Sequence, residues 1–412
     1  MVVTRDLDEA VARADTLLSI RSAAQQTGRV RVFRIRALLE SPSLLDFIKA
    51  AMLWMRSAVR REPMPLQCVL FARQSDISRI VASIDAERFH AIYVDGVRCI
   101  AVTRELRKKL PSTRIVVDLD DLMSRRFSLL AERRLPLSVG YVRRLLPRAV
   151  VRLIEGPISR WVIAYEARTL KAAEKEMLTV CDAATLVSSA EVELLKNGGH
   201  SSLRQKVQAI VPPVEMRSSA CRSRPPFRFI FIGSDRQTQN RLALDVLTDI
   251  WAKLRPATPL HVYGSQARKP PDVAGMHWHG FVADLNEVYA PGSILVIPAV
   301  LPGGIKWKVI ETFSFGCAVL GNPLAFEGLD IPNYPLRLPE EDWAPYLTAA
   351  EAHAATIEKA AEVGRRFVAV AGSRSRYAWE TVLAGVEPGE VGSELNESAA
   401  RAESPRASDS VH

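Results

Sequence analysis

Long apolar runs are absent from this chain of 412 residues. The most hydrophobic stretch, residues 44–59, is interrupted by Asp46, Lys49 and Arg56 and is shorter than the roughly 20 apolar residues that cross a bilayer. No charged segment followed by an apolar one opens the chain, as it would in a secretory signal peptide. The sequence therefore predicts a soluble, cytoplasmic protein.

Cysteine and the common nucleotide-binding motifs are also sparse. The five cysteines are scattered without a C-x-x-C pair, which argues against a disulfide framework or a structural zinc site. No P-loop is present, and no G-x-G-x-x-G follows an expected strand. His277 and His279 flank Trp278 on one expected strand, but without a third ligand a structural role is favoured over a metal site.

What is present is an ordinary globular composition. Hydrophobic residues make up 48% and charged residues 25%, and the length suits two domains with full cores. The net charge of +9 is modest for this length, so the position of the basic residues says more than their sum.

The second half of the chain alternates short apolar strands with amphipathic helices. This alternation predicts a parallel sheet covered on both faces, with ligands at the carboxyl ends of its strands. The expected strands are 227–233, 260–263, 276–281, 294–298 and 318–320, and the expected helices are 240–254 and 306–315.

The first half repeats this style less regularly. The expected strands are 30–35, 67–71, 91–95, 115–119 and 184–188, with helices at 45–59 and 100–110 and a helical, arginine-rich section at 127–178. Two α/β domains joined near residues 214–226 are the prediction, with closing helices at 351–370 and 377–384.

A glycine pair, Gly303 and Gly304, opens an expected helix that carries Lys306, Lys308 and Glu311. The free N–H groups of a helix start and nearby lysines suit a phosphate or diphosphate. A carboxylate one or two turns along can accept hydrogen bonds from the hydroxyls of a ribose or a sugar. The block predicts a nucleotide-sugar site.

Together with the following Gly316-Cys-Ala-Val-Leu320, this block resembles the group 1 glycosyltransferases (glycosyltransferase family 4-like), which have the GT-B fold. The resemblance spans about residues 115–329. It implies an α/β protein of two Rossmann-like domains whose parallel sheets face each other across a cleft. The expected domains are an acceptor-side domain at 1–214, a donor-binding domain at 215–386 whose closing helices cross back to the first, and a disordered tail at 387–412.

The resemblance also implies an activity. A hexosyltransferase of this kind moves a sugar, with retention, from a nucleotide-diphosphate sugar to a glycan or lipid-linked acceptor in cell-surface polysaccharide synthesis. No cofactor and no metal are implied. Two alternatives stay open: a GT-B nucleotide-sugar epimerase, and a catalytically impaired descendant that only binds a nucleotide sugar.

By this resemblance, Glu311 is the second glutamate of an E-x7-E pattern and holds the ribose. Gly303 stands where the first glutamate would grip the transferred sugar, which is a departure from the pattern. Lys306 and Lys308 are the expected diphosphate contacts, and Lys308 is counted among the catalytic residues. The alternative is that both are solvated helix lysines, with Lys308 paired to Glu311.

Two further segments match the family. Gly233 and Ser234, with a following arginine, resemble its diphosphate loop; both Arg236 and Arg241 are near, and spacing does not decide between them. Asn240 matches a variant of this loop and also suits a helix N-cap, the role we favour. Glu327, in a Glu-Gly-Leu tripeptide, is a further substrate-binding candidate.

The carboxylates Asp118, Asp120 and Asp121 follow an expected strand. They resemble the D-x-D metal site of GT-A glycosyltransferases, but the second half resembles the GT-B fold, which needs no such metal for catalysis. The D-x-D-x-T loop of haloacid-dehalogenase phosphatases fails because Leu122 replaces the threonine. In the resembling family this strand end reads His-Asp, so Asp120 replaces the histidine and Asp121 matches the aspartate. We predict catalytic roles for Asp121 and Asp120; a capped turn is the alternative.

Two further features are the start of the chain and an arginine-rich stretch. The resembling family begins with a strand and a glycine-rich loop, whereas here residues 1–4 precede an expected charged amphipathic helix at 6–24. The first βα unit is therefore predicted to be missing or to lie upstream of the given start. Ten arginines between Arg125 and Arg168 are interleaved with aliphatic residues, which predicts peripheral contact with the anionic inner face of the plasma membrane or a solvated helical hairpin. Nucleic-acid binding is disfavoured because no aromatic residues alternate with these arginines.

Overall fold

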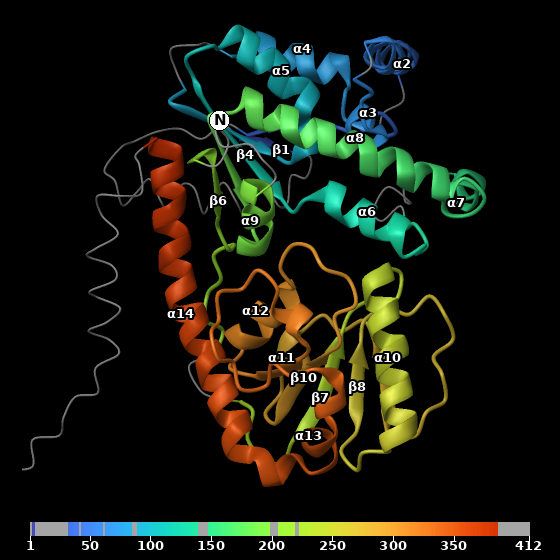
Figure 1. Cartoon of the computed structure of the whole chain (residues 1–412), viewed down its shortest axis with the longest axis vertical. Coiled ribbons are helices and arrows are strands. Elements are labelled where there is room, and N and C mark those ends of the chain that lie inside the picture. The colour runs from blue at the N-terminus through green and yellow to red at the C-terminus, as the bar shows by residue number, and fades with distance from the viewer. Residues whose placement is uncertain are drawn as a thin grey trace, which may run out of the picture.

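The computed structural model describes residues 2–4, 32–40, 43–60, 62–84, 89–138, 147–197, 205–218 and 222–385. The predicted helix at 6–24, Cys221 and the predicted disordered tail at 387–412 lie outside the described residues. Two α/β halves are stacked on each other, and the long helix α14 (Ala354–Ala384) runs along the side of both (Figure 1).

The first half contains a six-stranded parallel sheet in the order β2-β1-β3-β4-β5-β6. Its strands are β1 (Val2–Thr4), β2 (Val32–Arg34), β3 (Ala91–Asp95), β4 (Arg114–Asp120), β5 (Ala183–Leu186) and β6 (Val207–Ala209). The prediction that the first βα unit is missing is wrong for its strand, because β1 lies inside the sheet and pairs with both β2 and β3. Three consecutive β-branched residues suffice for a short interior strand.

The helices of the first half include one that the sequence pattern assigned to a strand. They are α2 (Leu44–Val59), α3 (Leu66–Leu70), α4 (Gln74–Ala82), α5 (Ile100–Lys109), α6 (Met123–Glu132), α7 (Arg148–Glu155), α8 (Ser159–Val180) and α9 (Ser189–Asn197). The predicted strand at 67–71 is wrong, since α3 occupies this segment. The N–H of Leu66 donates to Glu166 Oε1 at 2.6 Å, so a distant carboxylate satisfies the start of the helix.

The second half contains a five-stranded parallel sheet in the order β11-β10-β7-β8-β9. Its strands are β7 (Arg228–Ile232), β8 (Leu260–Tyr263), β9 (Met276–Gly280), β10 (Ser293–Ile297) and β11 (Ala318–Gly321), and its helices are α10 (Thr238–Leu254), α11 (Leu285–Val288), α12 (Trp307–Ser314) and α13 (Ala344–Thr348). The strands and helices predicted here are confirmed. The strand order reverses between β7 and β10, and ligands of such sheets bind outside the carboxyl ends at this point.

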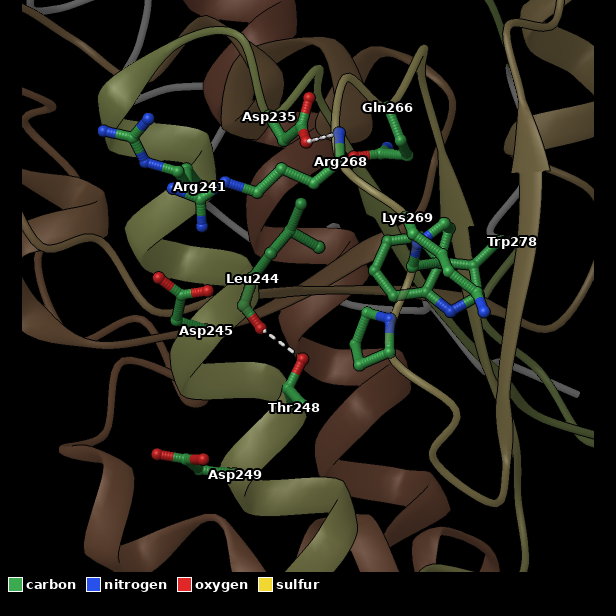
Figure 2. A pocket seen from close by; sticks show the side chains of 12 residues that line it. Asp235, Arg241, Leu244, Asp245, Thr248, Asp249, Gln266, Arg268, Lys269 and Trp278 are labelled. Carbon is green, nitrogen blue, oxygen red and sulfur yellow. Dashed lines mark hydrogen bonds between the residues drawn. The ribbon is translucent and has the colours of Figure 1, made fainter.

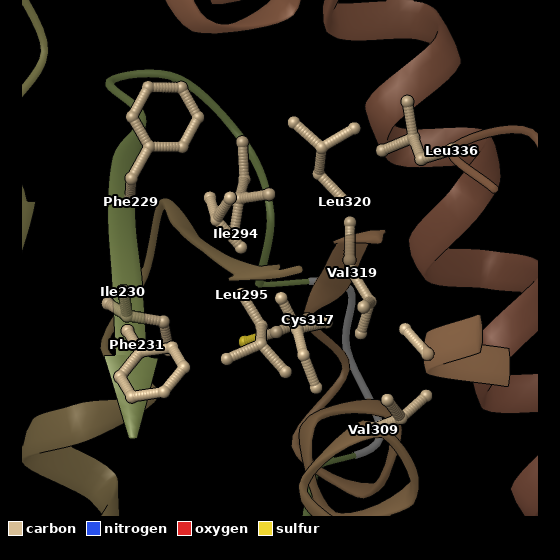
Figure 3. Close-up of a cluster of buried hydrophobic side chains, with 14 of the residues drawn as sticks. Phe229, Ile230, Phe231, Ile294, Leu295, Val309, Cys317, Val319, Leu320 and Leu336 are labelled. Atoms are coloured by element: carbon tan, nitrogen blue, oxygen red, sulfur yellow. The ribbon is translucent and has the colours of Figure 1, made fainter. Parts of the chain in front are cut away.

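A large apolar core surrounds the second sheet. Phe229, Phe231 and Leu295 from adjacent strands are almost fully buried and interlock with side chains from α12 and β11 (Figure 3). Helix α14 closes this core at Gly364, where a Cβ atom would lie only 2.2 Å from Phe313 Cδ1. The approach of α14 to α12 therefore requires glycine.

The last turns of α14 return to the first sheet. Trp379 and Val382 pack against Tyr93 and Val116, and Arg114 Nε donates to the Val382 carbonyl at 2.7 Å. The two closing helices predicted from the sequence are one continuous helix, and its return to the first half agrees with the family resemblance. The predicted domain limits near residue 214 fall between the last strand of one sheet and the first of the other.

Candidate functional site

The carboxyl ends of the two sheets meet at loops that contain the predicted site residues. A Cβ atom on Gly304 would lie 3.4 Å from Asp121 Cβ, and one on Gly328 would lie 2.2 Å from Ser188 Oγ. Both glycines have positive φ angles, 57° and 79°. The structure thus brings the glycine pair of the second half directly against the loop that follows β4.

Arg125 on α6 connects the halves through two carboxylates. Its Nη2 lies 2.7 Å from Glu327 Oε1, and its Nη1 lies 3.6 Å from Glu191 Oε1. Glu327 Oε2 in turn accepts the Gly303 N–H at 2.9 Å. In this structure a protein carboxylate therefore holds an N–H group that the sequence pattern assigned to the donor phosphate.

The three aspartates of the D-x-D stretch lie in different surroundings. Asp118 is buried and accepts hydrogen bonds from Tyr93 Oη at 2.8 Å and Thr185 Oγ1 at 3.0 Å. Asp120 is exposed with a φ of 64°, at an irregularity where β4 meets β5. Asp121 is buried at the contact between the halves and pairs with Arg126. Within the described residues, no three His, Cys, Asp or Glu side chains are grouped to hold a metal ion.

Sequence reasoning missed two buried glutamates beside Asp121. Glu191 is fully buried at the start of α9; its Oε2 accepts the Leu122 N–H at 3.3 Å. Its Oε1 has no hydrogen-bond partner among the described residues and lies 3.5 Å from the position a Cβ of residue 303 would take. Burial, reinforced by the negative charge of Asp121, raises the pKa of Glu191. No local motif marks this residue.

Glu174 on α8 is the second such group. It accepts the Ser124 N–H at 2.9 Å, and burial raises its pKa to about 7. The only sequence signal was a carboxylate among the inward positions of an amphipathic helix. Burial thus favours the protonated form of both acids, and for Glu174 the pKa lies near neutral pH.

Lys308 points into the second half rather than into solvent. Its Nζ donates to the Ile232 carbonyl at 2.7 Å and to Asn240 Oδ1 at 2.8 Å, and lies 4.4 Å from the centre of the Phe231 ring. Burial lowers the pKa of Lys308 to about 7. The alternative of a solvated lysine is therefore wrong for Lys308.

Lys306 precedes α12 as its N-cap residue. Its Nζ donates to the Gly303 carbonyl at 2.9 Å, and burial lowers its pKa. The lysine thus folds back over the glycine pair, within the electrostatic reach of Glu327 and Glu191.

Asn240 organises the loop after β7. Its amide nitrogen donates to the Ser234 carbonyl at 3.1 Å, and a Cβ on Gly233 would lie 2.7 Å from Asn240 Cγ. Helix α10 begins at Thr238 with Gln237 as its N-cap, so the predicted N-cap role of Asn240 is wrong. Asn240 instead joins the glycine loop to Lys308.

The two candidate arginines diverge. Arg236 is exposed, and its carbonyl accepts Ser138 Oγ of the first half at 3.3 Å. Arg241 lines a pocket of about 260 Å³ beside α10, where it faces the loop that carries Arg268 (Figure 2). Arg236 is thus the arginine next to the contact between the halves.

Glu311 lines a different pocket, of about 310 Å³, between α12, α14 and residues 213–217. Its Oε2 accepts Tyr289 Oη at 3.0 Å, and Trp307, one turn earlier and half-exposed, offers an indole face on the same wall. Arg217 and Arg376 supply positive charge. In this pocket the Trp307 indole could stack on a flat ring, the Glu311 carboxylate could accept hydrogen bonds from two hydroxyls, and the arginines could pair with an anionic group.

The arginine-rich stretch does not form one surface. Arg125 and Arg126 face the contact between the halves, and Arg133 Nη1 donates to the Val300 carbonyl at 2.9 Å. Arg143 and Arg144 lie outside the described residues. The exposed remainder consists of Arg134, which follows α6, and of Arg148, Arg152, Arg160 and Arg168 on α7 and α8.

The histidines of β9 lie beside a third one. His261 Nδ1 and His279 Nε2 are 2.8 Å apart, and the His277 ring centre is 5.3 Å from that of His261. Burial lowers the pKa of His261 to about 4.

Two parallel sheets that meet at their carboxyl ends, with a final helix that spans both halves, define the GT-B fold, as predicted. Residues 226–333 match the family model of the group 1 glycosyl transferases, which confirms the resemblance drawn from the sequence. No curated protein sequence matches this chain.

Solved structures similar to this chain extend the likeness over both halves. Anabaena HepE in complex with UDP-glucose has a TM-score of 0.55 at 11% identity, covering 92% of this chain and 99% of its own. The lipopolysaccharide outer core galactosyltransferase WaaB has a TM-score of 0.55 at 12% identity, covering 93% and 98%. A trehalose-6-phosphate synthase has a TM-score of 0.53 at 12% identity, covering 93% and 99%. At these identities the likeness shows the fold.

Proposed function

We propose that this protein is a glycosyltransferase that moves a sugar from a nucleotide-diphosphate sugar to a hydroxyl acceptor. The observation that supports it most is the position of the Gly303–Glu311 block, which lies within the matched family segment and against Asp121 of the other half. Similar structures contain UDP and UDP-glucose, which favours a nucleotide sugar as donor.

The donor would lie at the reversal point of the second sheet. Glu311 and the indole of Trp307 would hold the nucleoside in their pocket. The diphosphate would lie beside Gly233, Ser234 and Arg236. Lys306 would stabilise the charge that develops on the leaving diphosphate, and Lys308 would add positive charge while it keeps the end of β7 in place.

The transferred sugar would face the first half. Asp121 and Asp120 would accept hydrogen bonds from its hydroxyls or from the acceptor, as the family resemblance suggests. Glu191 lies where a side chain of residue 303 would begin, so its carboxylate would replace the glutamate that this chain lacks at Gly303. Glu327 accepts the Gly303 N–H and would release it, so that this N–H donates to an oxygen of the nucleotide sugar.

Finer features of the proposal come from the resemblance. These are transfer of a hexose with retention, as in family 4, and a glycan or lipid-linked acceptor in cell-surface polysaccharide synthesis. The likeness in fold to an outer core galactosyltransferase and to a synthase studied for transfer with retention supports these features. Peripheral placement on the inner membrane face belongs to the same proposal.

The test is a donor panel without and with acceptors. Wild-type protein is incubated with UDP, ADP, GDP and dTDP sugars, and the release of nucleoside diphosphate is measured. We expect release with one donor class and its stimulation by a hydroxyl acceptor. Isomerised donor without transfer would identify the epimerase, and binding of a donor without turnover would identify the impaired descendant.

A further inference from the structure

Helix α2 carries an apolar stripe that faces solvent. Large apolar residues recur along it at spacings of three and four, which places them on one face of the helix. They are between 41% and 84% exposed, and we call them the α2 stripe: Leu45, Ile48, Met52, Met55 and Val59. Leu44 extends the stripe at 77% exposure. A contiguous apolar surface of this kind marks an interaction site.

The other face of α2 is firmly attached to the protein. Trp54 Nε1 donates to Tyr165 Oη on α8 at 2.7 Å, and the buried Asp46 pairs with Arg73 at 3.1 Å. These contacts fix the rotation of the helix. The stripe is therefore held outward by the fold itself.

The exposed charges on α2 and its C-cap have one sign. Lys49, Arg56 and the C-cap residue Arg60 are exposed, whereas Asp46, the acid of this helix, is buried. Trp161 on α8 is 57% exposed and stacks on Tyr165, the residue that Trp54 contacts on the attached face of α2. Next to Trp161, Arg160 is also exposed.

We propose that α2 docks this protein on an anionic phospholipid surface. Apolar side chains on one face, flanked by cations, are the composition of helices that lie in the plane of a bilayer surface. Each cation near an anionic leaflet adds attraction that salt weakens. A symmetric contact with a second copy would instead bring Lys49 and Arg56 against their own equivalents, which like charge disfavours.

This surface is separate from the arginines at the contact between the halves. Figure 1 shows α2 at the outer end of the first half, away from the second sheet. Among the described residues no helix combines the length and hydrophobicity that a membrane crossing requires, so contact through α2 would be peripheral. The inference does not depend on the proposed transfer reaction.

The experiment is sedimentation of the full chain with vesicles of phosphatidylcholine, either pure or mixed equally with phosphatidylglycerol. We expect binding to the mixed vesicles that falls as salt rises. The double variant Ile48→Glu, Met52→Glu should bind at least about tenfold more weakly, because two carboxylates replace apolar contacts and repel the lipid. Lys49→Gln, Arg56→Gln should lose the preference for anionic vesicles. Val370→Glu, which places a charge at an exposed apolar position on α14, is the control and should bind as wild type does.

Three results would overturn the proposal. The first is wild-type protein that stays in solution with mixed vesicles. The second is a lower melting temperature of the Ile48→Glu, Met52→Glu variant in buffer, since it would mean that another segment of this chain covers the stripe. The third is a wild-type dimer by light scattering that the double variant converts to monomer, which would identify a second copy as the occupant.

Discussion

The two halves of the molecule bury different kinds of side chain. Among the described residues, nearly all the buried charged side chains lie in the first half: Asp46, Arg73, Asp76, Asp95, Asp118, Asp121, Glu166, Glu174 and Glu191. The second half buries Asp235 and the ammonium group of Lys308, and its core is otherwise apolar and aromatic, including the fully buried Trp251 and Trp343. The first half therefore adds specific polar pairs to its apolar core, whereas the second relies mainly on close packing, and the two should respond to different perturbations.

The largest effect is expected from overpacking the second half. Gly364→Leu would place side-chain atoms in the space that the Phe313 ring occupies. A Cβ atom alone would already lie 2.2 Å from Phe313 Cδ1. We expect a loss of more than about 3 kcal/mol in the free energy of unfolding, measured by urea denaturation. Gly372→Ala is the matched control on the same helix, since its Cβ would meet only the Val214 carbonyl at 3.3 Å. Equal stability of the two variants would contradict the close approach of α14 and α12.

In the first half the comparable change is the loss of one buried charge. Asp46→Ala would leave Arg73 buried without its partner, and we expect the free energy of unfolding to fall by about 3 kcal/mol. The control is Glu105→Ala, which breaks the exposed pair with Lys108 at 2.7 Å and should cost less than about 1 kcal/mol. If the two variants were equally stable, the polar core of the first half would not depend on this pair.

The pH dependence should also differ between the halves. Burial raises the pKa of Glu174 from 4.5 to about 7, so the folded protein binds this proton more tightly than the unfolded chain does. Glu174 therefore favours the fold below pH 4.5, and this contribution is lost as the pH rises toward 7, by up to about 1.4 kcal/mol per pH unit.

Glu174→Gln removes this titration and can still accept the Ser124 N–H. We expect the melting temperature of the variant to decline less than that of wild type between pH 5 and pH 7, in buffers of about the same ionic strength. Parallel curves for the two proteins would show that Glu174 titrates at its ordinary pKa.

The smallest effect concerns the site. Glu311→Ala should weaken binding of a nucleoside diphosphate by about tenfold, because it removes a charge-assisted hydrogen bond. Glu191→Gln should leave that affinity unchanged and should reduce the rate of sugar transfer. Titration calorimetry with UDP compares the two, with the exposed Glu341→Ala as control. Unchanged affinity in Glu311→Ala would remove its ribose role, and weaker nucleotide binding in Glu191→Gln would contradict its assignment to the sugar.

The parts that could be predicted from the sequence are those whose pattern is local. The strand at 91–95 and the whole order of elements in the second half are confirmed, because continuous apolar strands and helical periodicity are properties of neighbouring residues. The prediction of a strand at 67–71 was wrong because the first N–H of the helix there donates to Glu166, a residue about a hundred positions away. Asn240 was misplaced as an N-cap for a simpler reason, since boundaries of helices are less marked than their existence.

The sequence alone determined the fold class. It also determined the block of glycines, lysines and glutamate at 303–311 and the position of this block after a strand. Each of these depends on residues that are near one another in the chain. Only the tertiary structure decided which carboxylates meet that block. Arg125 and Glu327 are 202 positions apart, and Glu191 approaches Gly303 from helix α9 of the opposite half. Such pairs form because folding removes water from polar groups, which must then form hydrogen bonds with each other. The periodicity of the sequence does not indicate which groups will pair.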